Sequence, residues 1–312
     1  MLPVYYNRAI ARNSGSLVFA SDRTGTLQPY RLDVKTGESH QLTEAAELDP
    51  SSLTYTPDSR SLVFFAGPTL HMAAVATGHT RELYQVPEGW ERAPGMSVGP
   101  DGTHATFSEK KGDQSRLRTV TLGQGAVRTV LQTQGAIVHP IHRPMRAQIL
   151  YQGDESIWMV NSDGQQKRQL KVAPGRCVEP NWSADGKTIL YLNFPADPKQ
   201  LHNIRELAPD GSTDKLVVKT SQFASFAFNR DASVFAGASA NKASPTVLIV
   251  VRLSHSERTL CEHKASQPEN ATLFFAPDSQ RIYFQSDREG KQALYAMRVE
   301  KLVEKTETEG VG

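Results

Sequence analysis

The sequence predicts an all-β fold, namely a seven-bladed β-propeller made of four-stranded antiparallel blades. Three observations lead to this prediction: a short unit recurs seven times, its copies are evenly spaced, and most copies contain the same tight turn. A period of about 40–50 residues is typical of four-stranded propeller blades. We therefore expect one propeller domain over residues 1–302 and a charged tail over residues 303–312.

The repeated unit is an apolar stretch, a polar turn of the Pro-Asp-Gly type and an alternating strand that contains aromatic residues. Aligned at one position of that turn, the seven copies fall on Gly15, Ser59, Gly102, Arg146, Gly186, Ala232 and Ser279. In such a turn proline presets φ, aspartate bonds back to the backbone and glycine accepts a positive φ. Each copy therefore predicts two strands that reverse tightly.

The remaining strands of each blade follow from the same alternation. Third strands are expected at 29–34, 156–160 and 293–297, and short fourth strands at 40–43 and 168–171. Residues 4–11 are predicted to form the first strand of the first blade. The outer strand of the last blade would come from 301–308 or be missing, and a helix is expected at most in the tail.

Composition and charge exclude several function classes. The chain has 312 residues and a formal net charge of +2, which gives no electrostatic reason to expect nucleic acid or a membrane surface as a partner. No apolar run is long enough to cross a bilayer. The N-terminus does not look like a signal peptide, so a cytoplasmic location is expected, or a periplasmic one if a leader has been removed.

The two cysteines, Cys177 and Cys261, form no CxxC motif, which argues against a zinc knuckle or a thioredoxin-type site. We expect both to be reduced and buried. The sequence also contains no Gly-x-Ser-x-Gly elbow and no glycine-rich phosphate loop. A serine peptidase and a nucleotide-binding enzyme are therefore not indicated.

Two sets of motifs carry a family resemblance. The segments Ser-Asp-Arg-Thr-Gly at 21–25 and Ser-Asp-Arg-Glu-Gly at 286–290 resemble those of TolB-like propellers. Each follows the aromatic strand that comes after a repeated turn. The segments at 84–90, 139–144 and 157–164, with the stretch from Cys177 through Gly186, are similar to oligogalacturonate lyases and occur in the same order. The resemblance covers most of the chain and implies the propeller fold.

The resemblance to the lyases also implies a mechanism. That family cleaves short pectin fragments by β-elimination, with a manganese-like ion held by three histidines and one glutamine from the last two blades. The ion polarises the uronate carboxylate, and a nearby arginine or histidine removes the adjacent proton. The resemblance places the four metal-ligand positions of the family on Ser225, Gln267, Asn270 and Thr272 of this sequence.

Three of these four positions have therefore lost the histidine that the family uses. The candidate catalytic histidine of the family falls on Glu179, and its candidate arginine falls near Ser156. Serine, asparagine and threonine are weak neutral ligands for such a metal. We therefore expect no bound cofactor, with a weakly held manganese or calcium ion near Gln267 as the alternative.

Three basic residues precede the turn of the fourth copy. His139, His142 and Arg143 are expected to form a cationic lip at the mouth of the central channel, where Arg143 would bind a carboxylate in bidentate fashion. The alternative is a hydrogen-bonded turn that positions the neighbouring prolines. Both interpretations fit the residue types.

Four more residues are candidates for the same channel mouth. Glu179 either replaces the lost histidine as a base or pairs with an arginine such as Arg176. Trp90 either stacks on a sugar ring, with Arg92 beside it, or packs a loop. The other seven histidines show no ligand spacing and are expected to be structural or solvated.

These residues favour a lyase-like propeller with a degenerate metal site. It would bind an acidic oligosaccharide or a protein partner at the channel mouth, through His139, His142, Arg143, Arg176, Trp90 and Arg92. The alternative is an active lyase with a rebuilt site. Its catalytic candidates are then Glu179, Arg143 and His142.

Overall fold

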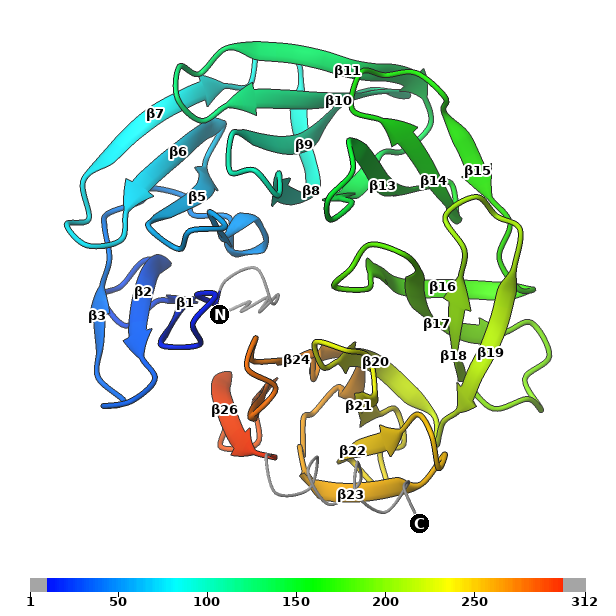
Figure 1. Ribbon diagram of the computed structural model, residues 1–312. Helices are drawn as coiled ribbons and strands as arrows, with labels where there is room; N and C mark the ends of the chain where they lie inside the picture. Colours follow the sequence, from blue (N-terminus) through cyan, green and yellow to red (C-terminus); the bar gives the residue numbers. More distant parts are fainter. Residues whose placement is uncertain (1–9, 300–312) are drawn as a thin grey trace. The chain divides into compact units, whose positions relative to one another are not determined.

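The computed structural model describes residues 10–299, which form seven antiparallel sheets (Figure 1). Five sheets have four strands and two have three, and the strands of each sheet are hydrogen-bonded in sequence order. Each sheet is one blade of the predicted propeller. No α-helix occurs in this part of the chain, and no helix there is long and apolar enough to span a membrane. Its helical elements are two short 3-10 turns, η2 (Pro50–Ser52) and η3 (Pro268–Asn270).

Contacts divide the described residues into two compact units, 10–170 and 171–299. Unit 1 holds blades 1 to 4. Blade 1 contains β1 (Ser16–Ser21), β2 (Gln28–Asp33) and β3 (Ser39–Gln41), and blade 2 contains β4 (Thr54–Tyr55), β5 (Ser61–Ala66), β6 (Thr69–Ala74) and β7 (Thr80–Gln85). Blade 3 contains β8 (Glu91–Val98), β9 (His104–Lys111), β10 (Gln114–Thr121) and β11 (Val127–Gln134). Blade 4 contains β12 (Val138–His142), β13 (Gln148–Gly153), β14 (Ser156–Asn161) and β15 (Arg168–Leu170).

Unit 2 holds blades 5 to 7. Blade 5 contains β16 (Gly175–Trp182), β17 (Ile189–Pro195), β18 (Asn203–Leu207) and β19 (Asp214–Lys219). Blade 6 contains β20 (Phe223–Phe228), β21 (Val234–Ser239), β22 (Thr246–Val251) and β23 (Glu257–Glu262). Blade 7 contains β24 (Leu273–Phe275), β25 (Arg281–Ser286) and β26 (Ala293–Arg298).

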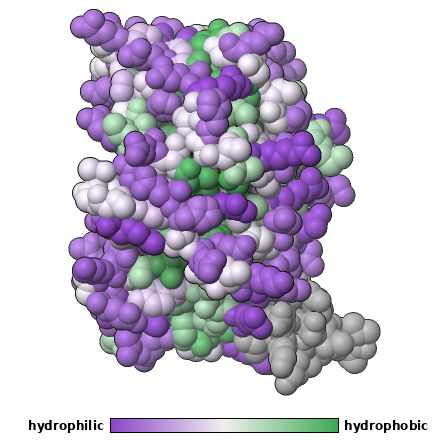
Figure 2. Space-filling model, turned by 90° about the vertical axis from the view of Figure 1, so that its left-hand side faces the viewer, coloured by the Kyte–Doolittle hydropathy of each residue, from purple (hydrophilic) through white to green (hydrophobic). Residues whose placement is uncertain are grey.

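The core lies between neighbouring blades of each unit. Phe65 of blade 2 packs edge-on against Phe107 of blade 3, with ring centroids 5.0 Å apart. Similar clusters join blades 5 and 6 and blades 6 and 7. Because a sheet inside a unit buries its faces against neighbouring blades, its central strands are apolar almost throughout. The surface seen in Figure 2 is mostly hydrophilic, with apolar residues in small separate areas.

The predicted turns are present in five copies without change. The residues with positive φ there are Ser59, Gly102, Gly186, Ala232 and Ser279. In the first copy the aligned residue is Ser14 rather than Gly15, because the bond from the Ala11 N–H to the Ser16 carbonyl closes the turn one residue earlier. In the fourth copy the positive φ falls on Met145 rather than on Arg146.

A close approach between blades recurs at three outer turns of unit 1. A Cβ atom on Gly78, Gly125 or Gly164 would lie 2.3, 2.6 or 2.2 Å from the carbonyl oxygen of a residue in the preceding blade. Those carbonyls belong to Leu42, Leu83 and Val130. Each glycine also has a positive φ. The absence of a side chain therefore lets neighbouring blades pack at van der Waals distance.

Several expectations fall on residues that the structure does not describe. Of the first strand expected at 4–11, only Ile10 and Ala11 lie within the described range, and Ile10 forms a single bridge to Leu17. The strand expected at 301–308 and the tail at 303–312 lie outside it. Cys177 and Cys261 are free thiols, but both are half-buried rather than buried. Cys261 packs at the margin of the core cluster between blades 6 and 7.

His263 is a buried structural histidine that ties blade 6 to blade 7. Its Nδ1 accepts the backbone N–H of Ala265 at 3.1 Å, so its Nε2 carries the proton and donates to the Ser239 carbonyl at 3.2 Å. The Ser286 hydroxyl donates to its carbonyl oxygen. Both ring nitrogens are therefore satisfied in the neutral form. Burial lowers the pKa of His263, and the bond to Ser239 partly opposes this.

This arrangement makes stability depend on pH. Because the folded pKa lies below the unfolded value, the unfolded chain takes up a proton first as the pH falls below about 6.5. We expect the wild-type protein to lose stability between pH 7 and pH 5. A His263→Asn variant should lose less over the same range, since an asparagine oxygen can still accept the Ala265 N–H. Melting temperatures at the two pH values test this, and equal losses would contradict it.

Candidate functional site

Glu179 lies at a bulge in β16. The pairing of β16 with β17 shifts between Val178 and Asn181, and Glu179 has φ of 50° directly before Pro180. A left-handed backbone is unfavourable for a residue with a side chain, and particularly before proline. The bulge turns Glu179 out of the ladder, and its Oε2 accepts the backbone N–H of Phe226 on β20 at 2.8 Å.

The surroundings of Glu179 shift its proton equilibrium. Burial raises the pKa of Glu179 to about 7, while the hydrogen bond from Phe226 acts in the opposite direction. Glu179 is nevertheless an exposed residue, and solvent limits the effect of burial on this pKa. The carboxyl group thus exchanges protons near neutral pH in an open site rather than in a closed pocket.

The four positions carried over from the lyases lie beside Phe226. Ser225 precedes it on β20, and its Oγ donates to the Ala271 carbonyl at 3.2 Å. Ala271 lies between Asn270 and Thr272, and the Asn270 amide donates to the Gln267 Oε1 at 3.3 Å. These contacts bring Glu179, Ser225, Gln267, Asn270 and Thr272 into one neighbourhood of unit 2, called here the polar cluster.

Gln285 on β25 adds a buried amide to the polar cluster. Its side chain is 5 % exposed, and its Nε2 donates to the Asn270 carbonyl at 3.0 Å. Its Oε1 and the Thr272 hydroxyl are buried without a hydrogen-bond partner. Gln285 is a member of the site that none of the sequence motifs indicates. Its signal is a single amide directly after the apolar and aromatic run Ile282-Tyr283-Phe284.

The donors of the polar cluster do not fit a manganese-type ion. Ser225, Gln267, Asn270 and Thr272 offer neutral hydroxyl and amide oxygens, and two of the amides bond to each other. The fifth member is a single carboxyl group with a raised pKa. Within 10–299 the structure shows no group of three or more His, Cys, Asp or Glu side chains that could hold a metal ion. Such ions are normally held by several imidazoles or carboxylates.

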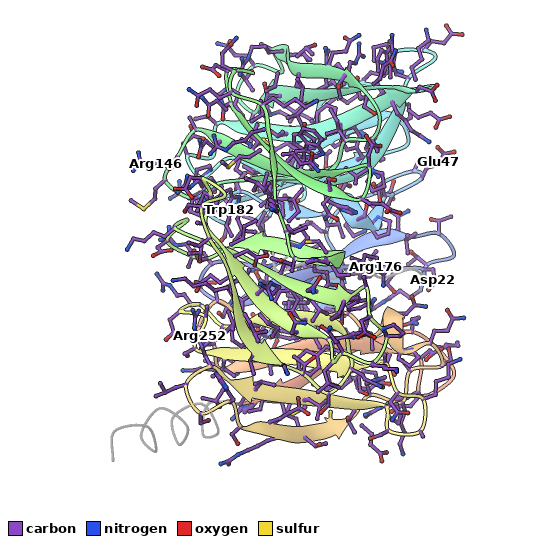
Figure 3. The ribbon with its side chains drawn as sticks, turned by 90° about the vertical axis from the view of Figure 1, so that its right-hand side faces the viewer. Asp22, Glu47, Arg146, Arg176, Trp182 and Arg252 are labelled. Carbon is purple, nitrogen blue, oxygen red and sulfur yellow. The ribbon has the colours of Figure 1, made fainter. Side chains whose placement is uncertain are left out.

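Arg176 lies on the same strand as Glu179 and is exposed. Its guanidinium group lies 4.6 Å from the ring centroid of Phe194, and that ring stacks on His202 at 3.9 Å with an interplanar angle of 10°. The His202 Nδ1–H in turn donates to the Phe223 carbonyl at 2.7 Å. This column of three groups fixes the orientation of the guanidinium. Figure 3 shows Arg176 and Trp182 at opposite ends of β16.

In unit 1, β12 repeats the bulge of β16. Its pairing with β13 shifts between Val138 and Ile141, and His139 has φ of 51° directly before Pro140. Gly95 of β8 lies against this bulge, since a Cβ there would be 2.6 Å from the His139 Cα. The same backbone device therefore displays a histidine in blade 4 and a glutamate in blade 5.

His142 and Arg143 lie at the other end of β12 from His139. At about 3.3 Å per residue, roughly 10 Å of chain separates His139 from His142 and about 13 Å separates it from Arg143. The His142 Nε2 is 2.7 Å from the Thr106 hydroxyl, and an Arg143 Nη1 donates to the Gln148 Oε1 at 2.6 Å. The three basic residues thus fall into two places, one at each end of the strand.

Trp90 and Arg92 are held by contacts within unit 1. The Arg116 guanidinium lies 3.8 Å from the Trp90 ring centroid. Arg92 forms an ion pair with Asp49 and lies 5.2 Å from the Phe65 ring centroid, and burial lowers its pKa to about 10. One face of the indole is thus covered by Arg116, and most of the Arg92 side chain is packed.

Comparison with known proteins agrees with this architecture. The model of the TolB β-propeller domain family matches residues 147–309, slightly more than half of the chain. An oligogalacturonide lyase of Pectobacterium atrosepticum is 23 % identical over 346 residues, covering 95 % of this chain and 89 % of the relative. The oligogalacturonate lyase of Dickeya dadantii is 23 % identical over 356 residues, with the same coverage.

Solved structures show the same fold. An oligogalacturonate lyase in complex with manganese superimposes with a TM-score of 0.85 at 23 % identity, covering 93 % of this chain and 88 % of the other. The oligogalacturonate lyase of Vibrio parahaemolyticus gives 0.86 at 21 % identity, covering 95 % and 89 %. The seven-bladed β-propeller predicted from the repeats is therefore confirmed, and the chain belongs to the TolB β-propeller domain family.

Proposed function

We propose that this protein binds an acidic oligosaccharide through unit 2 and does so without a metal ion. The observation that carries the proposal is the exposed guanidinium of Arg176, held in one orientation by Phe194 and His202. The likeness to oligogalacturonate lyases supports an oligosaccharide with uronate groups as the ligand class. The exposed Gln267 and Asn270 side chains would then bind sugar hydroxyls rather than a cation.

A fixed guanidinium suits a carboxylate ligand for two reasons. Its planar fork matches the two oxygens of a carboxylate, so it forms two parallel charge-assisted hydrogen bonds. The stack on Phe194 also restricts the side chain before the ligand arrives, which reduces the entropy lost on binding. The polar cluster includes Glu179 on the same strand, and its exposed Gln267 and Asn270 amides can donate to and accept from sugar hydroxyls.

Binding rather than elimination is proposed because three of the four metal-ligand positions of the lyases carry no histidine in this chain. Abstraction of the proton next to the uronate carboxylate needs an electrophile on that carboxylate. The neutral oxygens of the polar cluster do not form a site for a metal ion that could act as this electrophile. No elimination step is therefore assigned to this chain.

Arg176→Gln is expected to weaken binding of oligogalacturonate by about tenfold or more, the typical value of a lost charge-assisted bond. Arg176→Lys should recover only part of the affinity, because lysine lacks the planar fork. Isothermal titration calorimetry in the presence of a chelator is the measurement. Arg230→Gln is the matched control, since Arg230 is exposed on a turn of blade 6. An unchanged affinity for Arg176→Gln, or wild-type binding that requires manganese, would contradict the proposal.

The second candidate function is a lyase with a rebuilt site, and Glu179 is the observation in its favour. A general base works best when its pKa is close to the operating pH, and the pKa of Glu179 is raised to about 7. The test follows the absorbance of the unsaturated uronate product with and without manganese. Turnover that is lost in Glu179→Gln, while that variant still binds the oligosaccharide, would replace the binding proposal with this one.

A further inference from the structure

The Ser-Asp-Arg-x-Gly motif has the same local structure in blades 1 and 7. In both copies the glycine N–H donates to the aspartate carbonyl, at 2.9 Å in blade 1 and 2.8 Å in blade 7. The arginine of the motif then lies over a tyrosine ring of the next strand. Arg23 is 4.3 Å from the Tyr30 ring centroid, and Arg288 is 4.1 Å from that of Tyr295. The motif thus restricts the orientation of an exposed guanidinium group.

In blade 7 this guanidinium lines a cavity in the surface of unit 2, called here the blade 7 cavity. The cavity has a volume of about 460 Å³ and lies between the end of β23 and the motif. Small-molecule sites typically have volumes of about 300–1,000 Å³. Its lining residues are Cys261, Glu262, Lys264, Arg288 and Glu289. The motif therefore places an oriented cation in the wall of a cavity large enough for a small ligand.

The charges in the wall of the blade 7 cavity balance. Two cations and two carboxylates line it, so the formal charge of the lining residues is zero. The Lys264 Nζ is 2.9 Å from the Glu262 Oε2, which is a close ion pair. The Arg288 Nε is 3.8 Å from the Glu289 Oε1, and an Arg288 Nη1 donates to the Glu262 carbonyl at 3.4 Å. One ion pair is therefore within hydrogen-bond distance and the other is not.

The longer ion pair suits a ligand that carries both charges on neighbouring atoms. The ligand's carboxylate accepts from Arg288 and its ammonium group donates to Glu289, so two charge-assisted hydrogen bonds replace one long contact. Displacing the pair costs little, because exposed ion pairs contribute little free energy. The Tyr295 ring already restricts the guanidinium, which reduces the entropy lost on binding. A polyanion is disfavoured, since the carboxylates in the wall repel its further charges.

We propose that the blade 7 cavity binds a free α-amino acid. Its carboxylate bonds to Arg288 and its ammonium group to Glu289, which are adjacent in the chain as the two groups are adjacent in the ligand. The rest of the wall is the Cys261 thiol and the closed pair of Lys264 and Glu262. These groups are polar and carry no net charge, so they favour a neutral polar side chain such as that of glutamine. None of the lining residues belongs to the oligosaccharide site proposed above, so the two proposals stand independently.

The test is a saturation-transfer difference NMR titration of the full chain with L-glutamine. Two charge-assisted bonds at an exposed site should give a Kd of about 0.1–5 mM. Arg288→Gln and Glu289→Gln should each weaken binding by about fivefold or more. Arg23→Gln is the matched control and should leave the affinity within about twofold. Arg23 holds the same place in the motif of blade 1 and stacks on Tyr30 in the same way.

Two altered ligands separate a binding role from a structural one. The α-amide of glutamine lacks the carboxylate, and N-acetyl-L-glutamine lacks the ammonium group, so both should bind about fivefold or more weakly. Arg288→Gln should not weaken binding of the amide further, and Glu289→Gln should not weaken binding of the acetylated ligand further. A merely structural role would weaken binding of all three ligands alike. The comparison stays valid if Arg288→Gln also lowers the melting temperature.

Three results would overturn the proposal. The first is no binding of L-glutamine up to about 20 mM, well above the expected Kd. The second is an affinity that is the same for L-glutamine, its α-amide and its acetylated form. The third is binding of oligogalacturonate, but not of L-glutamine, that depends on Arg288. That result would make the blade 7 cavity a saccharide site, whatever the outcome of the Arg176 experiment.

Discussion

Replacing Gly78 with alanine is expected to lower the free energy of unfolding by about 2–4 kcal/mol, since overpacking adds to the strain of a positive φ. Gly78 has φ of 72°, and a Cβ there would lie 2.3 Å from the Leu42 carbonyl oxygen of the preceding blade. That oxygen belongs to the backbone, so two blades must move apart to accommodate a methyl group. Urea denaturation of the variant and the wild type measures the loss.

Gly37→Ala is the matched control for this prediction. Both glycines follow a threonine in the turn before the last described strand of their blade, and both donate to the carbonyl four residues earlier. Gly37 has φ of 78°, but a Cβ there would meet nothing within 4 Å. Its replacement should therefore cost only about 1 kcal/mol of backbone strain. Equal losses in the free energy of unfolding for the two variants would show that the close contact between blades does not contribute to the effect of Gly78→Ala.

Glu109→Gln is expected to destabilise the protein by about 3–5 kcal/mol, because it breaks a buried ion pair and leaves the opposite charges in place. Glu109 is fully buried on β9. Its carboxylate accepts from Arg116 and from the Tyr84 hydroxyl, and Arg118 lies 3.9 Å away. Glutamine keeps the shape of the side chain and its bond to Tyr84, so the loss reports on the charge.

The control for this second prediction is Glu91→Gln. Glu91 pairs with Lys110 at 3.2 Å on the same sheet, but both side chains are exposed, and such a pair is worth about 0–1 kcal/mol. Tryptophan fluorescence adds a local readout, because Arg116 also covers the Trp90 ring. A loss for Glu109→Gln as small as that for Glu91→Gln would mean that water compensates the buried charges.

The repeat predicted the blades because strand spacing and turn chemistry are local properties of the sequence. Pro57-Asp58-Ser59 forms the expected reversal, and the third strand expected at 156–160 is observed as β14. In the first copy, glycine preference predicts a positive φ at Gly15, but Ser14, one residue earlier, adopts it. The preference of glycine for a positive φ does not by itself predict that the Ala11 N–H to Ser16 carbonyl bond closes this turn.

The candidate site was harder to predict, because its contacts join blades that are a whole repeat apart. Nothing near Glu179 in the sequence indicates that its carboxylate meets the Phe226 N–H, and nothing near Ser225 points to Ala271. The position of Trp90 in the sequence likewise does not indicate that the Arg116 guanidinium, on β10, covers its ring. The roles of His139, His142 and Arg143 in ligand binding stay predictions.

The paired bulges at His139-Pro140 and Glu179-Pro180 have an evolutionary consequence. In both, the backbone bends in the same way although one side chain is a base and the other an acid. The scaffold therefore presents whichever residue stands there without needing to refold around it. A propeller of this kind can exchange its chemistry one blade at a time, which is a route by which an enzyme and a binding protein can descend from one architecture.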